Sequence, residues 1–177
     1  MKKTIASLAR PLLMSWLMSL LVVAAPTMAQ VPRVLGVWEL DAKASKLPAG
    51  FPLASETRSY DLRDDGYLVN VVIRKYANGH PDFIQVVAKS DGKEYPQYQG
   101  AQLADFQVKG AITKSTYSET AIDEYSVNVI ARYDGKVNTR GVRKIAADGK
   151  TMTIDVVAID QNGKEQPINL VFRRVGG

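Results

Sequence analysis

The sequence predicts an all-β protein in which about 8–10 antiparallel strands form an up-and-down meander that closes into a barrel. The first observation behind this prediction is a set of Asx-Gly dipeptides spaced 13 or 14 residues apart, with one gap of 43 residues that equals about three further units. Asx-Gly favours hairpin turns because both central residues of a type I′ turn need positive φ. The six dipeptides are Asp65-Gly66, Asn78-Gly79, Asp91-Gly92, Asp134-Gly135, Asp148-Gly149 and Asn162-Gly163.

The second observation is the alternation of apolar and polar residues between these turns. The apolar positions on alternate residues are Tyr125, Val127, Val129, Ala131 and Tyr133, then Met152, Ile154, Val156 and Ala158, and finally Ile168, Leu170 and Phe172. Such a period of two indicates strands with one buried and one wet face. A single sheet of this size can hide its apolar face by closing into a barrel or by folding over as a sandwich. Consecutive short hairpins favour the up-and-down barrel, which also removes exposed edges.

Residues 1–29 have the features of a cleaved secretory signal peptide. Lys2, Lys3 and Arg10 are basic, Leu12 to Ala25 is almost entirely apolar, and Ala29 ends a small-residue cleavage site. An uncleaved anchor is the alternative, but the apolar stretch is shorter than the ~20 residues that span a bilayer. We therefore expect a periplasmic or secreted protein without a stable membrane span after cleavage, whose residues 30–177 form a single β-barrel domain.

The expected elements follow in chain order. Val34–Asp41 is the first strand, a single helical turn follows at Ala42–Lys46, and Leu47–Pro52 is a loop because its two prolines interrupt regular structure. The remaining expected strands are Ser55–Arg63, Tyr67–Tyr76, Asp82–Ser90, a weak segment near Asp105–Lys109, Lys114–Glu119, Tyr125–Tyr133, Val137–Ala146, Thr151–Asp160 and Pro167–Arg174.

Composition narrows the function. Without the signal peptide, 20 basic and 18 acidic residues leave a net charge of +2, and no run of Lys or Arg exceeds two residues, so we expect no nucleic-acid partner. The chain has no cysteine, which excludes disulfides, thiol catalysis and thiolate metal sites. An outer-membrane barrel is a rival interpretation, but Arg58, Arg132 and Arg143 lie within predicted strands and argue against it.

Several short motifs resemble one family of proteins. They are Gly36-Val37-Trp38-Glu39-Leu40-Asp41 with Ser45-Lys46, Ser55-Glu56-Thr57-Arg58 with Tyr60, Ser90-Asp91-Gly92-Lys93-Glu94-Tyr95-Pro96, Tyr133-Asp134-Gly135-Lys136, Arg143, and Asp148-Gly149-Lys150-Thr151-Met152-Thr153. In this order they are similar to small, secreted, largely uncharacterised bacterial proteins with a lipocalin-like β-barrel. The likeness covers most of the chain after residue 29.

The resemblance implies a barrel but no established activity. In lipocalins the Gly-x-Trp motif lies at the closed end of the barrel, where an arginine from a late strand packs across the indole. Trp38 matches the tryptophan, and Arg143 or Arg173 could supply the arginine, with Arg143 preferred. Both Trp38 and Arg143 are therefore expected to have structural roles, through a cation–π contact of about 0.5–2 kcal/mol.

The sequence contains few residues that could together form a catalytic site. His80, the one histidine, falls in a predicted turn, and no Gly-x-Ser-x-Gly nucleophile elbow is present. The acidic pairs Asp64-Asp65 and Asp123-Glu124 also fall at predicted turns, and adjacent strand residues point to opposite faces. We expect a protein that is not an enzyme and that uses no catalytic residue, metal or cofactor.

A binding site for a small, largely apolar molecule is the first hypothesis. Tyr95 and Tyr98, in an expected loop from Tyr95 to Gly100, would lie at the barrel mouth, and Leu47–Phe51 would be a second rim element or a plug. The residues expected to face inward are Tyr67, Val69, Val71, Phe83, Tyr125, Val127, Val129, Met152, Ile154, Leu170 and Phe172, and the expected ligand contacts are Tyr67, Tyr95, Tyr98 and Tyr125. The second hypothesis is a packed barrel without a ligand that serves as a structural or protein-interaction module of the cell envelope.

Overall fold

The structure, a computed structural model, describes residues 31–100 and 113–176. The expected signal peptide 1–29 and the weak strand near Asp105–Lys109 lie outside the described residues. The described elements are α1 (Val31–Val34), β1 (Gly36–Leu40), β2 (Leu53–Leu62), β3 (Leu68–Tyr76), β4 (Pro81–Ala88), β5 (Tyr95–Gln99), β6 (Ser115–Ala121), β7 (Ser126–Tyr133), β8 (Lys136–Ile145), β9 (Thr151–Ile159) and β10 (Glu165–Gly176).

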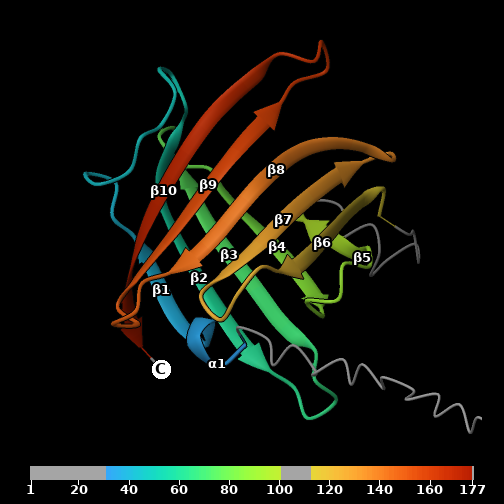
Figure 1. Cartoon of the computed structure of the whole chain (residues 1–177). Coiled ribbons are helices and arrows are strands. Elements are labelled where there is room, and N and C mark those ends of the chain that lie inside the picture. The colour runs from blue at the N-terminus through green and yellow to red at the C-terminus, as the bar shows by residue number, and fades with distance from the viewer. Residues whose placement is uncertain (1–30, 101–112, 177) are drawn as a thin grey trace, which may run out of the picture.

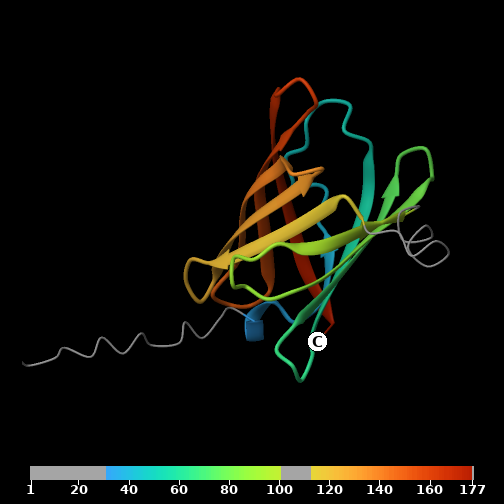
Figure 2. The same cartoon turned by 90° about the vertical axis from the view of Figure 1, so that its right-hand side faces the viewer.

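The described strands form one closed antiparallel barrel (Figures 1 and 2). Each strand pairs with its neighbours in the sequence, and β1 pairs with both β2 and β10 to complete the circle. The predicted all-β meander and its closure into a barrel are thus confirmed. Because successive hairpins alternate between the two ends, the turns that follow β2, β6 and β8 share the end where α1 lies (Figure 1).

The Asx-Gly dipeptides occupy the connections between strands as predicted, but their geometry differs from the prediction. All six glycines have positive φ, between 67° and 83°. Only Asp134, at φ 51°, is a positive-φ residue other than glycine in the described chain, so the type I′ pattern fits Asp134-Gly135 alone. In the other five turns only the glycine needs the left-handed region. In four of them the Asx side chain accepts a backbone hydrogen bond, as Asp148 Oδ1 does from the Lys150 amide at 2.9 Å, and in the Asn162-Gly163 turn Asp160 Oδ1 takes this role.

The end of the barrel near α1 is closed by a packed core around Trp38. The indole is fully buried, and its Nε1 donates a hydrogen bond to the Val34 carbonyl at 2.7 Å. Ile145, Met152 and Phe172, also fully buried, pack in the same cluster. This core faces inward, which is the reverse of the outward apolar band of an outer-membrane barrel. Within the described residues no helix has the length and apolar character to cross a membrane.

The arginine over Trp38 is Arg174, so the predictions of Arg143 and Arg173 were wrong. The Arg174 guanidinium carbon lies 4.3 Å from the centroid of the indole. Its Nε donates to the Gly149 carbonyl at 2.7 Å, and its two Nη atoms donate to the carbonyls of Arg33 and Leu35. Trp38 and Arg174 are direct cross-strand partners, whereas Arg173 points outward to Asp41. Arg174 therefore ties the closed end to the segment that precedes β1.

The predicted inward faces were right for β7, β9 and β10 and wrong for β3 and β4. Val127, Val129, Met152, Ile154, Leu170 and Phe172 are buried as expected. On β3, however, Leu68, Asn70 and Val72 are the buried positions, so Val69 and Val71 face outward. On β4, Ile84 and Val86 are buried, and Phe83 lies on the outer face.

The segment expected as a loop from Tyr95 to Gly100 is instead largely a strand. Gln97 of β5 pairs with Val86 of β4, and Tyr95 of β5 pairs with Tyr117 of β6. The expected rim segment is therefore part of the barrel wall, and its alternate residues Gln97 and Gln99 face the interior.

Candidate functional site

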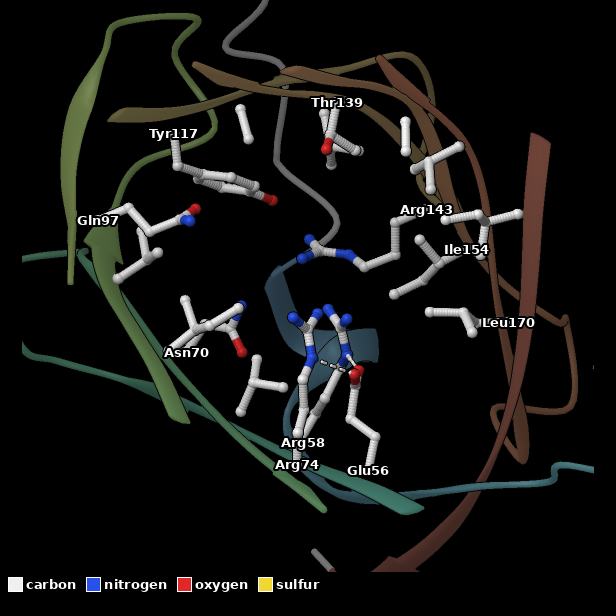
Figure 3. A pocket seen from close by; sticks show the side chains of 18 of the residues that line it. Glu56, Arg58, Asn70, Arg74, Gln97, Tyr117, Thr139, Arg143, Ile154 and Leu170 are labelled. Carbon is white, nitrogen blue, oxygen red and sulfur yellow. Dashed lines mark hydrogen bonds and ion pairs between the residues drawn. The ribbon is translucent and has the colours of Figure 1, made fainter. Parts of the chain in front are cut away.

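The barrel interior contains a cavity of about 320 Å³ above the Trp38 core. Phe51 and Asn138 line it and are exposed, so the cavity reaches solvent at the end away from α1. The expectation that Leu47–Phe51 contributes to the rim is borne out for Phe51. Figure 3 shows the cavity with polar side chains from opposite walls directed toward its centre.

One wall is mainly apolar and is formed by the late strands. Ile154 and Val156 of β9 and Ile168 and Leu170 of β10 line it, and Val72, Ile84 and Val86 line the opposite side. These positions are medium-sized aliphatic residues, which leave room in the upper barrel where the larger Trp38 and Phe172 fill the lower part. The cavity therefore offers apolar surface to a bound molecule.

Glu56 and two arginines form a buried charge cluster on β2 and β3. Glu56 accepts hydrogen bonds from Arg58 Nε at 2.5 Å and from Arg74 Nε at 2.6 Å, and its side chain is fully buried. Burial alone would raise the pKa of Glu56, but the two guanidinium charges outweigh it and hold the pKa below its ordinary value. Glu56 is thus ionised at neutral pH. In Figure 3 the two guanidinium groups lie side by side and face the cavity.

Arg143 of β8 and Glu119 of β6 form a second buried ion pair. Arg143 Nη2 lies 3.2 Å from Glu119 Oε2, and both side chains are almost completely buried. Glu119 also accepts hydrogen bonds from Tyr117, at 2.8 Å, and from Ser90. Burial acts to raise the pKa of Glu119, but the Arg143 charge and these donors hold it below its ordinary value. Burial and the adjacent carboxylate raise the pKa of Tyr117 well above its ordinary value, so its hydroxyl stays protonated.

Three buried polar atoms beside the cavity meet no partner at hydrogen-bonding geometry within the described chain. They are the Tyr60 hydroxyl, Asn70 Oδ1 and Arg143 Nε, and all three residues line the cavity. A buried polar group without a partner costs on the order of 1–3 kcal/mol. Such groups are rare in folded proteins, and here all three lie at one cavity.

None of the four tyrosines predicted as ligand contacts lines the cavity. Tyr67 and Tyr95 meet edge to face, with ring centroids 5.8 Å apart, at the closed end. The Tyr95 hydroxyl donates to Asp91 at 3.0 Å, and burial together with this bond raises its pKa to about 12. Tyr125 packs under the Arg33 guanidinium at 4.3 Å, and Tyr98 alternates with Gln97 and Gln99, which do line the cavity. These tyrosines belong to the barrel wall and the closed end.

Among the polar cavity residues that sequence reasoning missed are Glu56, Arg58, Asn70, Arg74 and Gln97. A signal for them was present, because Glu56, Arg58 and Tyr60 alternate on β2 and Asn70, Val72 and Arg74 alternate on β3. In most strands of a barrel the apolar residues face inward and the polar residues face solvent, and on β2 and β3 polar residues face inward instead. Arg143 was predicted to contact Trp38, but it lines this cavity, with its guanidinium carbon 5.0 Å from the centroid of the Tyr60 ring.

His80, the one histidine, lies outside the cavity. His80 is exposed in the turn between β3 and β4, with its amide bonded to Asn78 Oδ1 at 3.0 Å. Across residues 31–100 and 113–176, no three His, Cys, Asp or Glu side chains gather in a way that could hold a metal ion. No protein-family model matches the chain, and no curated protein matches it significantly. The assignment of function therefore rests on the cavity itself.

Proposed function

We propose that this protein is a non-enzymatic, exported, lipocalin-like barrel that binds a small molecule with a largely apolar body inside its cavity. The observation that carries the proposal is the combination of an apolar wall with three buried polar atoms that lack partners, the Tyr60 hydroxyl, Asn70 Oδ1 and Arg143 Nε. A ligand that fills the cavity would satisfy these atoms and bury apolar surface in the same step.

The size of the cavity supports a small ligand. Its volume of about 320 Å³ lies near the lower limit of the ~300–1,000 Å³ typical of ligand pockets. Burial of apolar ligand surface supplies roughly 25 cal/mol per Å². The polar side chains Asn70, Gln97 and Arg143 then fix the orientation of the ligand.

Export and the lipocalin relationship are supported by sequence features. The basic and apolar segments before Ala29 have the features of a signal peptide. The Gly36-x-Trp38 motif, with Arg174 across the indole, is arranged as the resemblance to lipocalin-like proteins implies for the closed end.

A role in protein interaction is the second candidate, and one surface feature favours it. Val71 and Ile73 of β3 and Pro81 and Phe83 of β4 line a shallow apolar groove on the outside of the barrel. The Ile73 side chain is exposed, at 59%. Exposed apolar patches of this kind often mark contact sites.

Native mass spectrometry of the protein purified from its own cell envelope separates the two candidates. The expected result is a noncovalent adduct of low mass that solvent extraction removes. A clean polypeptide mass from the envelope preparation would overturn the binding proposal, and loss of an envelope complex in Ile73→Asp would then support the interaction module.

Ala131→Phe provides a cavity-blocking variant for this experiment. Ala131 lines the cavity on β7, so a phenyl ring there occupies ligand space. Ile130→Phe is the matched control because Ile130 is adjacent on the same strand and faces away from the cavity. The adduct should disappear in Ala131→Phe and persist in Ile130→Phe.

A further inference from the structure

The charges around the cavity do not balance. Arg58, Arg74 and Arg143 line it, and the carboxylates that meet them are Glu56 and Glu119. Arginine stays protonated in proteins, and both carboxylates are ionised. Within these ion pairs the three arginines therefore outnumber the two carboxylates by one, and Arg58 and Arg143 are largely buried whereas Arg74 is a quarter exposed.

The excess charge lies on the pair formed by Arg58 and Arg74. Glu119 is matched to Arg143 as an ion pair, whereas Glu56 is shared between two guanidinium groups. Each of these two arginines uses Nε for Glu56. Figure 3 shows their Nη atoms directed into the cavity, where Arg58 also lies next to Tyr60.

The third guanidinium faces this pair from the opposite wall. In Figure 3 Arg143 extends from β8 toward Arg58 and Arg74, and the space between them is open. Arg143 Nε, a donor, is one of the buried atoms without a partner and can donate to an anionic oxygen in this space. Guanidinium N–H groups in this arrangement are the donors that bind a planar carboxylate best.

We propose that the ligand is an amphipathic monoanion whose carboxylate head lies between Arg143 and the Arg58–Arg74 pair, and whose apolar chain lies along Ile154, Val156 and Leu170. The inference rests on the proposed function and specifies the ligand class of the same cavity. A single negative charge cancels the excess, and the aliphatic wall accepts the chain. The volume has room for at least about ten water-sized groups at ~30 Å³ each, which suits a medium-chain acid.

Octanoate and octanamide are matched probes for this inference, because they have about the same size and shape and differ in charge. Isothermal titration calorimetry of the full exported protein at neutral pH and fixed salt should give octanoate an affinity at least about tenfold higher than that of octanamide. Arg74→Gln should remove this preference, since it removes the excess charge and leaves each carboxylate with one arginine. Octyl phosphate, as a third probe, should bind more weakly than octanoate because its second charge exceeds the excess.

Arg140→Gln is the matched control. Arg140 lies on β8 like Arg143, but it is exposed and pairs with Glu165 at 2.6 Å on the outer surface. This variant should keep the preference for octanoate, and thermal melting of both variants confirms that they fold.

Two results distinguish failure of the anionic head group from failure of the binding cavity. Equal affinity for octanoate and octanamide would overturn the anionic head group while leaving the binding cavity intact. Binding of neither probe, together with a clean native mass of the envelope protein, would overturn both.

Discussion

Replacement of Glu119 by glutamine removes the carboxylate that neutralises Arg143 inside the barrel. The ion pair spans 3.2 Å, and the exposed fractions of the two side chains are 3% for Arg143 and 2% for Glu119. Glutamine keeps the size of the side chain and an oxygen that can still accept from Tyr117, so little of the effect comes from packing. The variant therefore isolates the loss of one buried charge.

The expected cost is about 3–5 kcal/mol of the free energy of unfolding, the range for a buried ion pair that loses one partner. Removal of both charges should cost far less, because the penalty comes from the unmatched guanidinium that stays buried. We expect the double variant Glu119→Gln/Arg143→Met to lie within about 2 kcal/mol of the wild type, since it leaves no unmatched buried charge and the amide oxygen at position 119 still accepts from Tyr117.

Urea denaturation followed by circular dichroism measures these differences, provided that the m-value is unchanged. Glu165→Gln is the control, because the Arg140–Glu165 pair is about half exposed on each side and should contribute only about 0–1 kcal/mol. A loss in Glu119→Gln no larger than in this control would refute the reasoning, and so would a double variant less stable than Glu119→Gln.

Three further predictions concern the closed end, the sheet and the acid range. Arg174→Met should lower the free energy of unfolding by about 2–4 kcal/mol, because the carbonyls of Arg33, Leu35 and Gly149 lose their hydrogen-bond donor. The same variant should change the fluorescence spectrum of Trp38, and an unchanged spectrum would contradict the stacking of Arg174 on the indole. Gly141→Ala should destabilise the protein by at least about 1–3 kcal/mol, because an added Cβ would lie 2.1 Å from the Asp155 carbonyl oxygen. Thermal melting measures this loss, and a melting temperature equal to that of the wild type would refute the close approach of β8 and β9. The pKa values of Glu56 and Glu119 are lowered by folding, so their contribution to stability is complete above the unfolded value of about 4.3 and is lost as the pH falls through the folded values. Urea midpoints measured between pH 7 and pH 2.5 should therefore fall below about pH 4, and more steeply in the wild type than in Glu119→Gln.

The turns and the regular strands could be predicted from local chemistry. The glycines of the six Asx-Gly dipeptides all adopt positive φ, a conformation that side chains disfavour, so these positions are visible without tertiary information. The alternation in β9 and β10 was equally direct because Met152 and Phe172 face the packed core and Ile154 and Leu170 face the apolar wall of the cavity.

The cavity could not be predicted in the same way because its polar residues interrupt that alternation. On β3 the apolar residues Val69, Val71 and Ile73 point outward, while Asn70 and Arg74 point inward. A rule that places apolar residues inside must therefore choose the wrong face there. The result also explains the apolar groove outside β3 and β4, since Val71, Ile73 and Phe83 remain at the surface.

The place of Arg174 could have been found by extending one pattern. Ile168, Leu170 and Phe172 share the inward face of β10, and Arg174 is the next residue on that face. The choice of Arg143 came from its isolated position in an alternating strand, a feature that fits a charged cavity residue equally well. What separates the two arginines is the register of β1 against β10, which sets Trp38 opposite Arg174 and which depends on closure of the barrel.

A crystal structure of the protein purified from its own cell envelope, without solvent extraction, tests the central claim most directly. The account predicts continuous density in the cavity, with a polar end within hydrogen-bonding distance of Arg143 Nε and an apolar end against Ile154 and Leu170. A cavity that holds only separate water molecules bonded to the Tyr60 hydroxyl, Asn70 Oδ1 and Arg143 Nε would contradict it.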